Sequence, residues 1–140
     1  PGGNWKPKIW SIKNYNLLLM KILSQNTNIK FIIVGSKSEE KIYLSELSKN
    51  IDSTYIVNLF GASLTQTAAY MKRSKLFIGN DSGLSHMASA AKLKSIVLFG
   101  PTNSEKFAPK IKNIDILDSK IIYNSDDIET INEEDVLKLI

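Results

Sequence analysis

The stretch LFIGNDSGLSHMASAAKLKSIVLFGPT, residues 76–102, decides the fold. It begins with the apolar run 76–78, continues through the polar turn 79–83, and passes into a helical segment rich in small residues at 84–93. A second apolar run follows at 95–99. Strand, turn, helix and strand in this order predict a βαβ unit of a parallel sheet. The turn would lie at the carboxyl end of a strand and the N-terminus of a helix, where such sheets bind ligands.

Apolar runs and helical patterns alternate along the rest of the chain. The runs expected to form strands are residues 30–35, 55–59, 76–80, 95–99 and 113–117, with 120–123 as a weaker candidate. The patterns expected to form helices are residues 14–25, 38–49, 64–73, 84–93 and 131–140, with one helical turn at Ser104. The expected helix N-caps are Asn14, Ser36 or Ser38, Ser63 and Asn132. This alternation predicts an α/β fold with a doubly wound parallel sheet, in which the run 30–35 is buried on both faces.

Size and composition bound the class of protein. The 140 residues suffice for one domain and are too few for two, so we expect a single domain over residues 1–140. A further strand is expected to precede Pro1. The chain is 43% hydrophobic and 23% charged, which is typical of a globular protein rather than a disordered one.

Charge and cysteine content exclude several functions. The net charge of +4 is spread over scattered lysines, so no nucleic acid partner is expected, although the charge suits a small anionic ligand. The chain has no cysteine, which excludes disulfides, thiolate metal sites and cysteine nucleophiles. Its longest apolar runs are too short to cross a bilayer.

The polar turn of the opening stretch carries the chemistry. A helix that begins here offers unpaired backbone N–H groups, Gly83 lets a ligand approach closely, and the Ser82 hydroxyl can cap the helix or donate to a phosphate. Asp81 would either cap the helix or accept hydrogen bonds from sugar hydroxyls. His86 lies in the first turns and can face the same pocket. A purely structural capping arrangement remains the alternative.

The N-terminal residues PGGNWKPKIW also have two interpretations. In one, they form a terminus that packs on the body through Trp5 or Trp10. In the other, the glycines form an anion-binding loop to which Lys6 or Lys8 supplies charge.

The run NDSGLSHMASA at residues 80–90, followed by SIVLFGPT at 95–102, resembles the core motif of the heptosyltransferase family, glycosyltransferase family 9. That motif is Asp-Ser/Thr-Gly, two residues, His, an alanine-rich helix, a strand and Phe-Gly-Pro-Thr. Three other segments resemble parts of the same family: residues 1–10 its post-strand loop and Lys-x-Trp element, residues 31–39 its ribose-holding strand, and residues 61–64 its adenine-side loop. The resemblance extends from Pro1 to about Pro109.

The resemblance implies a Rossmann-like fold, the C-terminal half of a GT-B glycosyltransferase. It implies that the following residues contact the donor substrate: Gly3, Asn4, Lys8, Glu39, Ala62, Asp81, Ser82, Gly83, Leu84 and His86. Lys8 and the helix start at residues 82–84 would stabilise negative charge on the departing nucleoside diphosphate, without a metal ion or other cofactor. The catalytic base, an aspartate, would belong to the N-terminal half, so residues 1–140 alone are expected to bind nucleotide and transfer nothing.

By the same resemblance the expected reaction is an inverting transfer of heptose from ADP-heptose to a lipid-linked saccharide of the lipopolysaccharide inner core. The other half would bind the acceptor, in the cytoplasm or at the cytoplasmic face of the inner membrane as a peripheral protein. Two alternatives stay open: a GT-B donor half that uses a UDP- or GDP-sugar, and a non-catalytic flavodoxin-like binding module. A dinucleotide dehydrogenase is not favoured, because the chain has no GxGxxG motif.

Overall fold

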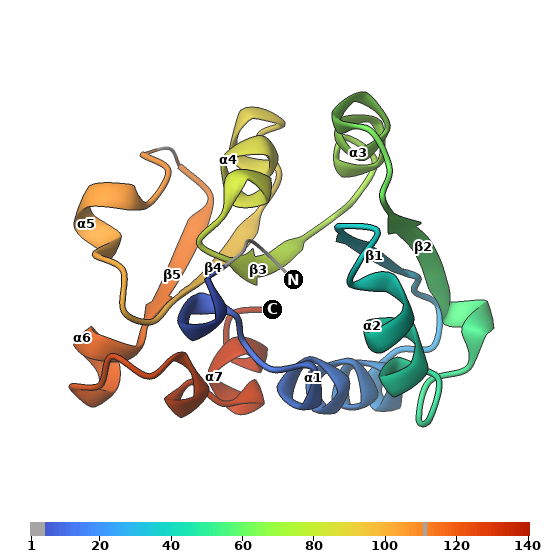
Figure 1. Cartoon of the computed structure of the whole chain (residues 1–140), viewed down its shortest axis with the longest axis horizontal. Helices are drawn as coiled ribbons and strands as arrows, with labels where there is room; N and C mark the ends of the chain where they lie inside the picture. Colours follow the sequence, from blue (N-terminus) through green and yellow to red (C-terminus); the bar gives the residue numbers. More distant parts are fainter. Residues whose placement is uncertain (1–4, 111) are drawn as a thin grey trace.

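The protein is described by a computed structural model that covers residues 5–110 and 112–140 (Figure 1). Its strands are β1 (Phe31–Gly35), β2 (Ile56–Phe60), β3 (Phe77–Asn80), β4 (Ser95–Phe99) and β5 (Ile114–Asp118). Its α-helices are α1 (Ile12–Gln25), α2 (Glu40–Leu47), α3 (Leu64–Met71), α4 (Gly83–Ala90), α5 (Ser104–Phe107), α6 (Ser119–Tyr123) and α7 (Glu133–Leu137). Short 3-10 turns lie at Lys6–Lys8 (η1), Ser53–Tyr55 (η2) and Ile128–Thr130 (η3).

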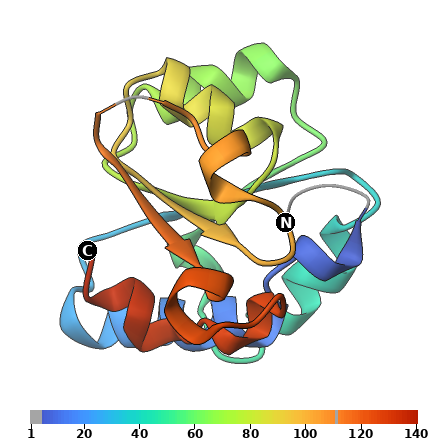
Figure 2. The same ribbon diagram turned by 90° about the vertical axis from the view of Figure 1, so that its left-hand side faces the viewer.

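Parallel pairing organises the strands, as the helical crossovers require. In one sheet β1 pairs with β2, and in the other β4 lies between β3 and β5. Helices α3 and α4 lie on one side of the strands and α1 and α7 on the other, in both views (Figures 1 and 2). The α/β class and the doubly wound arrangement predicted from the sequence are therefore confirmed. The strands nevertheless form two sheets within the described residues rather than one continuous sheet.

Burial differs between the strands. Every residue of β4 is buried, because it has a strand on each side and helices on both faces. Every residue of β1 is only half-buried. The prediction that the run 30–35 is fully buried was therefore wrong; β1 has a strand on one side only among the described residues.

Two of the helix N-caps differ from those predicted from the sequence, and two agree. Helix α1 is capped by Ser11, whose Oγ accepts from Asn14 N, so Asn14 is not the cap. Helix α2 has Glu39 at its N-cap position, without a side-chain cap from Ser36 or Ser38. The caps predicted at Ser63 and Asn132 are confirmed, as is the helical turn that begins at Ser104.

The C-terminal region departs most from the sequence-based elements. Residues 120–123 were expected to be extended, but they form α6, because the Asp118 carboxylate accepts from the backbone N–H groups of Lys120 and Ile121 and starts a helix. Helix α7 ends at Leu137 rather than at Ile140. Helix α4 ends at Ala90, and Lys92 beyond it adopts a left-handed conformation with φ 57°.

The main core contains Trp10, which is fully buried, together with Leu18 of α1, Ile96 and Leu98 of β4, and Val136 of α7. Trp10 Nε1 donates to the Ile131 carbonyl at 2.7 Å, and its ring packs edge-on against Tyr15 at 4.9 Å between centroids. Trp5 is about half exposed. The interpretation in which a tryptophan packs the N-terminal segment onto the body is therefore confirmed for Trp10.

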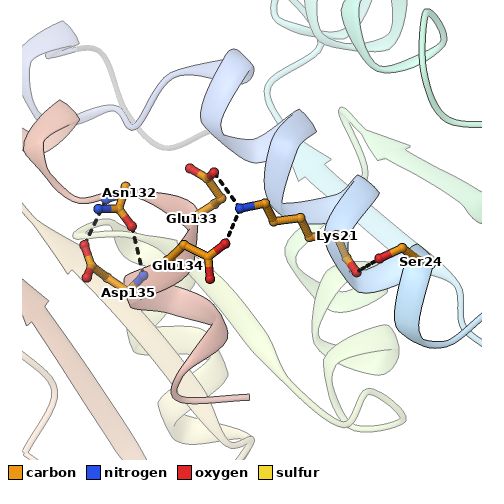
Figure 3. A network of polar contacts seen from close by, with 6 residues as sticks. All are labelled: Lys21, Ser24, Asn132, Glu133, Glu134 and Asp135. Carbon is orange, nitrogen blue, oxygen red and sulfur yellow. Dashed lines mark hydrogen bonds and ion pairs between the residues drawn. The ribbon is translucent and has the colours of Figure 1, made fainter.

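An ion-pair cluster joins the first helix to the last (Figure 3). Lys21 of α1 pairs with Glu133 at 2.9 Å and with Glu134, both at the start of α7. The N-cap of α7 is reciprocal: Asn132 Oδ1 accepts from Asp135 N, and Asp135 Oδ2 accepts from Asn132 N. The η3 segment before α7 contacts the N-terminal segment, because the Ser11 N–H donates to Glu129 Oε1 at 2.6 Å. No helix among the described residues has the length and apolarity to cross a membrane.

Candidate functional site

The turn between β3 and α4 forms the centre of the site. Strand β3 ends at Asn80, and the Asp81 N–H donates to the Leu98 carbonyl at 3.1 Å, which holds the turn against β4. Ser82 is the N-cap of α4: its N–H donates to Ser85 Oγ at 3.4 Å, and Ser85 Oγ donates to the Ser82 carbonyl at 2.7 Å. The first N–H groups of α4, at Gly83 and Leu84, have no intrahelical acceptor by helix geometry, so this end of the helix favours anions.

A buried hydroxyl group and an open space lie at this helix start, and among the described residues a second unpaired hydroxyl lies in the loop after β4. Ser82 Oγ and Thr102 Oγ1 are buried, and neither finds a hydrogen-bond partner within the described part of the chain. A Cβ added at Gly83 would meet no atom within 4 Å. Because buried polar atoms are rarely left unpaired, the Ser82 hydroxyl is a candidate partner for a ligand beside Gly83.

Lys8 brings a positive charge to the same turn. Its Nζ lies 3.8 Å from Asp81 Oδ2, and the two side chains are 23% and 10% exposed. Asp81 is therefore an ion-pair partner and not the cap of α4, which corrects the capping alternative. The Trp10 N–H donates to Asn80 Oδ1 at 3.2 Å, which fixes the Lys8 segment at the end of β3.

A second group of residues lies at the ends of β1 and β2. Gly61, at φ 74°, follows β2, and its N–H donates to the Gly35 carbonyl at 2.9 Å. Ala62 follows in the same turn and is half-buried. The Glu39 carboxylate accepts from both the N–H and the hydroxyl of Ser36, at 2.8 and 2.6 Å through Oε2. This group places one carboxylate beside a glycine turn.

Two half-buried tyrosines, Tyr15 of α1 and Tyr43 of α2, lie near these two groups. The Tyr15 hydroxyl donates to Asn80 Oδ1 at 3.3 Å. Burial, and next the nearby Tyr43, raise the pKa of Tyr15. Burial, and next the nearby Glu39, raise the pKa of Tyr43. The Tyr15 hydroxyl therefore ties α1 to the end of β3, and the Tyr43 ring of α2 lies 6.0 Å between centroids from that of Phe60 at the end of β2.

The remaining sequence-predicted residues are less constrained. His86 is exposed on α4, one turn beyond Ser82, and Leu84 is partly buried against Ala88 and Leu93. Gly3 and Asn4 lie outside the described residues. Sequence reasoning missed Tyr15, whose hydroxyl contacts Asn80 at the end of β3. Nothing in a lone tyrosine on an amphipathic helix indicated the contact of Tyr15 with Asn80.

The fold and the strand-end cluster define a Rossmann-like α/β unit of the kind that forms one half of GT-B glycosyltransferases. The family description "Glycosyltransferase family 9 (heptosyltransferase)" matches residues 1–137, so the chain belongs to this family.

Individual relatives agree in sequence and in fold. The chain is 31% identical to lipopolysaccharide heptosyltransferase 1 of Campylobacter coli over 99% of its own length and 44% of that protein. It is similar to the structure of the E. coli heptosyltransferase WaaC with ADP (TM-score 0.84, 19% identity, 99% of this chain and 41% of that chain). It is also similar to the structure of that enzyme with ADP-2-deoxy-2-fluoro heptose (TM-score 0.79, 20% identity, 99% and 40%). The chain thus spans less than half the length of these relatives.

Proposed function

We propose that this chain is the donor-binding half of an inverting heptosyltransferase, which holds ADP-heptose while heptose is transferred to a lipid-linked inner-core saccharide. The observation that carries the proposal is the start of α4, where Ser82 Oγ is buried without a partner among the described residues, next to the open space at Gly83. Family membership supports the sugar, and two of the similar structures are of an E. coli enzyme with ADP and with ADP-2-deoxy-2-fluoro heptose.

In this proposal each residue acts through charge and position. The helix start at Ser82–Leu84 and the Lys8 ammonium bind the diphosphate and stabilise the negative charge that grows on it as the sugar leaves. Asp81 and His86 accept from and donate to sugar hydroxyls, and Glu39 binds the ribose hydroxyls. Ala62 contacts the adenine, and Gly3 and Asn4 contact the diphosphate. The protein works as one domain over residues 1–140, and no metal ion or other cofactor takes part.

In this proposal the other half of the enzyme binds the acceptor, supplies the general base and faces the membrane. The name of the Campylobacter coli relative supports lipopolysaccharide as the destination of the sugar. We propose a cytoplasmic enzyme that meets its lipid-linked acceptor at the inner face of the inner membrane. The half described here binds nucleotide but has no turnover by itself.

Calorimetry with ADP, UDP, GDP and ADP-heptose tests the donor assignment. We expect ADP and ADP-heptose to bind and the other two nucleotides to bind at least about tenfold more weakly, since adenine contacts contribute on the order of 1.4 kcal/mol or more. A preference for UDP or GDP would assign the half to another sugar donor, and binding of none of them would support the non-catalytic module.

The variant Gly83→Glu tests ligand binding at the start of α4 without disturbing the fold. The new carboxylate enters open space and sits at a helix N-terminus, so helix propensity and the helix dipole favour it, yet it repels a diphosphate. We expect unchanged or higher thermal stability and loss of ADP binding. Ile121→Glu on α6, where Ile121 is 73% exposed, adds the same charge elsewhere and should leave ADP binding intact. Normal ADP binding by Gly83→Glu would reject the site.

A further inference from the structure

The Glu39 carboxylate lies over the last residue of β1. A Cβ added at Gly35 would stand 3.1 Å from Glu39 Oε2, so the carboxylate packs on the backbone of this glycine. The Gly61 N–H donates to the Gly35 carbonyl at 2.9 Å, which brings the turn after β2, with Ala62, to the same strand end. Glu39 and Ala62 are therefore close enough in the fold to contact neighbouring parts of one nucleoside.

Ser36 holds one oxygen of this carboxylate with two donors. Its N–H and its hydroxyl donate to Glu39 Oε2 at 2.8 and 2.6 Å, lengths typical of strong hydrogen bonds to a charged acceptor. The Ser36 hydroxyl has a single proton, which goes to Glu39. In the 3.0 Å contact between Ser36 Oγ and Ser38 Oγ, the Ser38 hydroxyl is therefore the donor. Two serine hydroxyls in series thus act on one carboxylate oxygen.

The Ser36 hydroxyl does not cap the helix that follows. In a capping box a serine hydroxyl accepts from the backbone N–H three residues further on. Here the Glu39 N–H donates to the backbone carbonyl of Ser36 at 3.1 Å instead, and the N-cap position of α2 has no side-chain cap. Because the hydroxyl proton goes to the carboxylate, the hydroxyl contributes to the position of Glu39 and not to the start of α2.

The second oxygen of Glu39 stays available. The lysine of this segment, Lys37, pairs with Glu40, which also accepts from Asn58 Nδ2 at 2.7 Å. Both hydrogen bonds to the Glu39 carboxylate within the described part of the chain go to Oε2, so none of them occupies Oε1. An ionised carboxylate oxygen is an acceptor only, and Oε1 therefore suits a ligand hydroxyl.

We propose that Ser36 is a positioning residue, whose hydroxyl, supported by Ser38, fixes Glu39 Oε2 and leaves Oε1 to accept from a ribose hydroxyl of the bound nucleotide. The inference rests on the proposed function, in which Glu39 binds the ribose, and adds how the site distinguishes ribose from a sugar without hydroxyls. The carboxylate is ordered before the ligand arrives, so less freedom is lost on binding. A nucleotide without these hydroxyls leaves Oε1 without its donor, which disfavours its binding.

Calorimetry on the full-length protein with ADP and with 2′,3′-dideoxy-ADP, which lacks both ribose hydroxyls, tests the proposal. We expect the parent protein to prefer ADP by about tenfold or more, as for a hydrogen bond to a charged group. Ser36→Ala should lower the affinity for ADP by about 3- to 10-fold and leave that for dideoxy-ADP unchanged. Ser36→Thr keeps the hydroxyl and should retain the preference. Ser45→Ala is the matched control, because its exposed hydroxyl on α2 donates only to the Ile42 carbonyl, and both affinities should stay unchanged.

A double-mutant cycle completes the test. Glu39→Ala should abolish the preference for ADP, and Ser36→Ala added to it should change little, because no carboxylate remains to be positioned. An unchanged preference in Ser36→Ala would reject the proposal, as would an equal loss of affinity for both nucleotides, which would indicate a purely structural role. Equal affinity of the parent protein for both nucleotides would overturn this inference alone. Binding of neither nucleotide would overturn the proposed function as well.

Discussion

The backbone N–H of Trp10 donates a 3.2 Å hydrogen bond to Oδ1 of Asn80, the last residue of β3. The same oxygen accepts from the Tyr15 hydroxyl at 3.3 Å. One buried amide therefore holds the N-terminal segment and α1 at the strand end where the candidate site begins. The position of Lys8 follows from this contact rather than from its own ion pair, which is long and partly exposed.

Trp10→Phe should destabilise the protein by about 1–3 kcal/mol, because the Ile131 carbonyl loses its indole donor in a buried place and the smaller ring leaves a gap. Urea unfolding followed by circular dichroism measures the change. Trp5→Phe is the matched control, since Trp5 is about half exposed, and it should change stability by less than about 0.5 kcal/mol. Equal effects of the two variants would contradict the anchoring role of Trp10.

Asn80→Ala should cost more than Tyr15→Phe. The first variant leaves the Trp10 N–H without its acceptor, whereas the second removes one neutral hydrogen bond, worth about 1 kcal/mol. Both can be compared in the same urea titration. Because Asn80 supports the Lys8 segment, Asn80→Ala should also weaken ADP binding. If Asn80→Ala lowered stability but left the affinity for ADP unchanged, the contact between Asn80 and Trp10 would have no role in ADP binding.

Alkaline pH should destabilise the protein through Tyr15. Its pKa is raised in the folded state by burial, so the unfolded chain releases this proton above about pH 10 while the folded protein retains it. Stability is then fully present below pH 10 and falls above it, by up to about 1.4 kcal/mol per pH unit for one group. Tyr15→Phe should make the free energy of unfolding depend less on pH between pH 9.5 and about pH 11, as measured by urea midpoints. An unchanged slope would mean that Tyr15 ionises freely in the folded protein.

Acid should remove the contribution of the Lys21 cluster. The pKa of Glu133 is lowered, first by its hydrogen bond with Lys21, so its stabilising effect is present above the ordinary glutamate pKa and is lost as pH falls through the lowered value. Lys21→Met should therefore be slightly less stable than the parent at neutral pH, with the difference shrinking toward pH 3 and in high salt. A difference that persists in acid would point to lost packing of the lysine stem instead.

Lys8→Met should weaken binding of ADP by about 10- to 100-fold and reduce its salt dependence, since one cation near the proposed diphosphate site is removed. Lys6→Met provides the comparison, because Lys6 lies in the same 3-10 turn but is exposed. Both variants should have melting temperatures close to that of the parent protein. If Lys6→Met reduced affinity as strongly, general attraction by a basic chain would explain the effect, and Lys8 would have no special place.

Gly35→Ala and Gly83→Ala should have opposite effects on stability. A Cβ at Gly35 would stand 2.5 Å from the Phe60 ring, whose edge is confined by Tyr43. Overpacking of this kind costs about 1–3 kcal/mol. A Cβ at Gly83 meets nothing, and alanine is the better helix former, so this variant should gain up to about 1 kcal/mol. Phe60→Leu should partly relieve Gly35→Ala in a double-mutant cycle, and simple additivity would contradict the clash.

The sequence carried the order of elements because its apolar runs and caps are local signals. Ser63 and Asn132 cap the helices that they precede, and the β3–α4 turn lies where its pattern placed it. Residues 120–123 were wrongly predicted to be extended because their β-branched residues favour a strand. The Asp118 carboxylate instead caps a helix there. The contacts of Tyr15 and Trp10 depend on residues 65 and 121 positions away, which no local pattern encodes. The break between the sheets likewise depends on which strands become neighbours, and strand order lies beyond what an apolar run specifies.

The bond from Trp10 Nε1 to the Ile131 carbonyl has a consequence for synthesis on the ribosome. Chains emerge from the N-terminus, so Trp10 is exposed long before residue 131 is made. The Trp10 indole therefore lacks its hydrogen-bond acceptor until residue 131 has been made, and a large apolar ring stays partly uncovered meanwhile. Nascent chains stalled before residue 131 should be captured by chaperones that recognise apolar surface, and release from them should coincide with the emergence of α7.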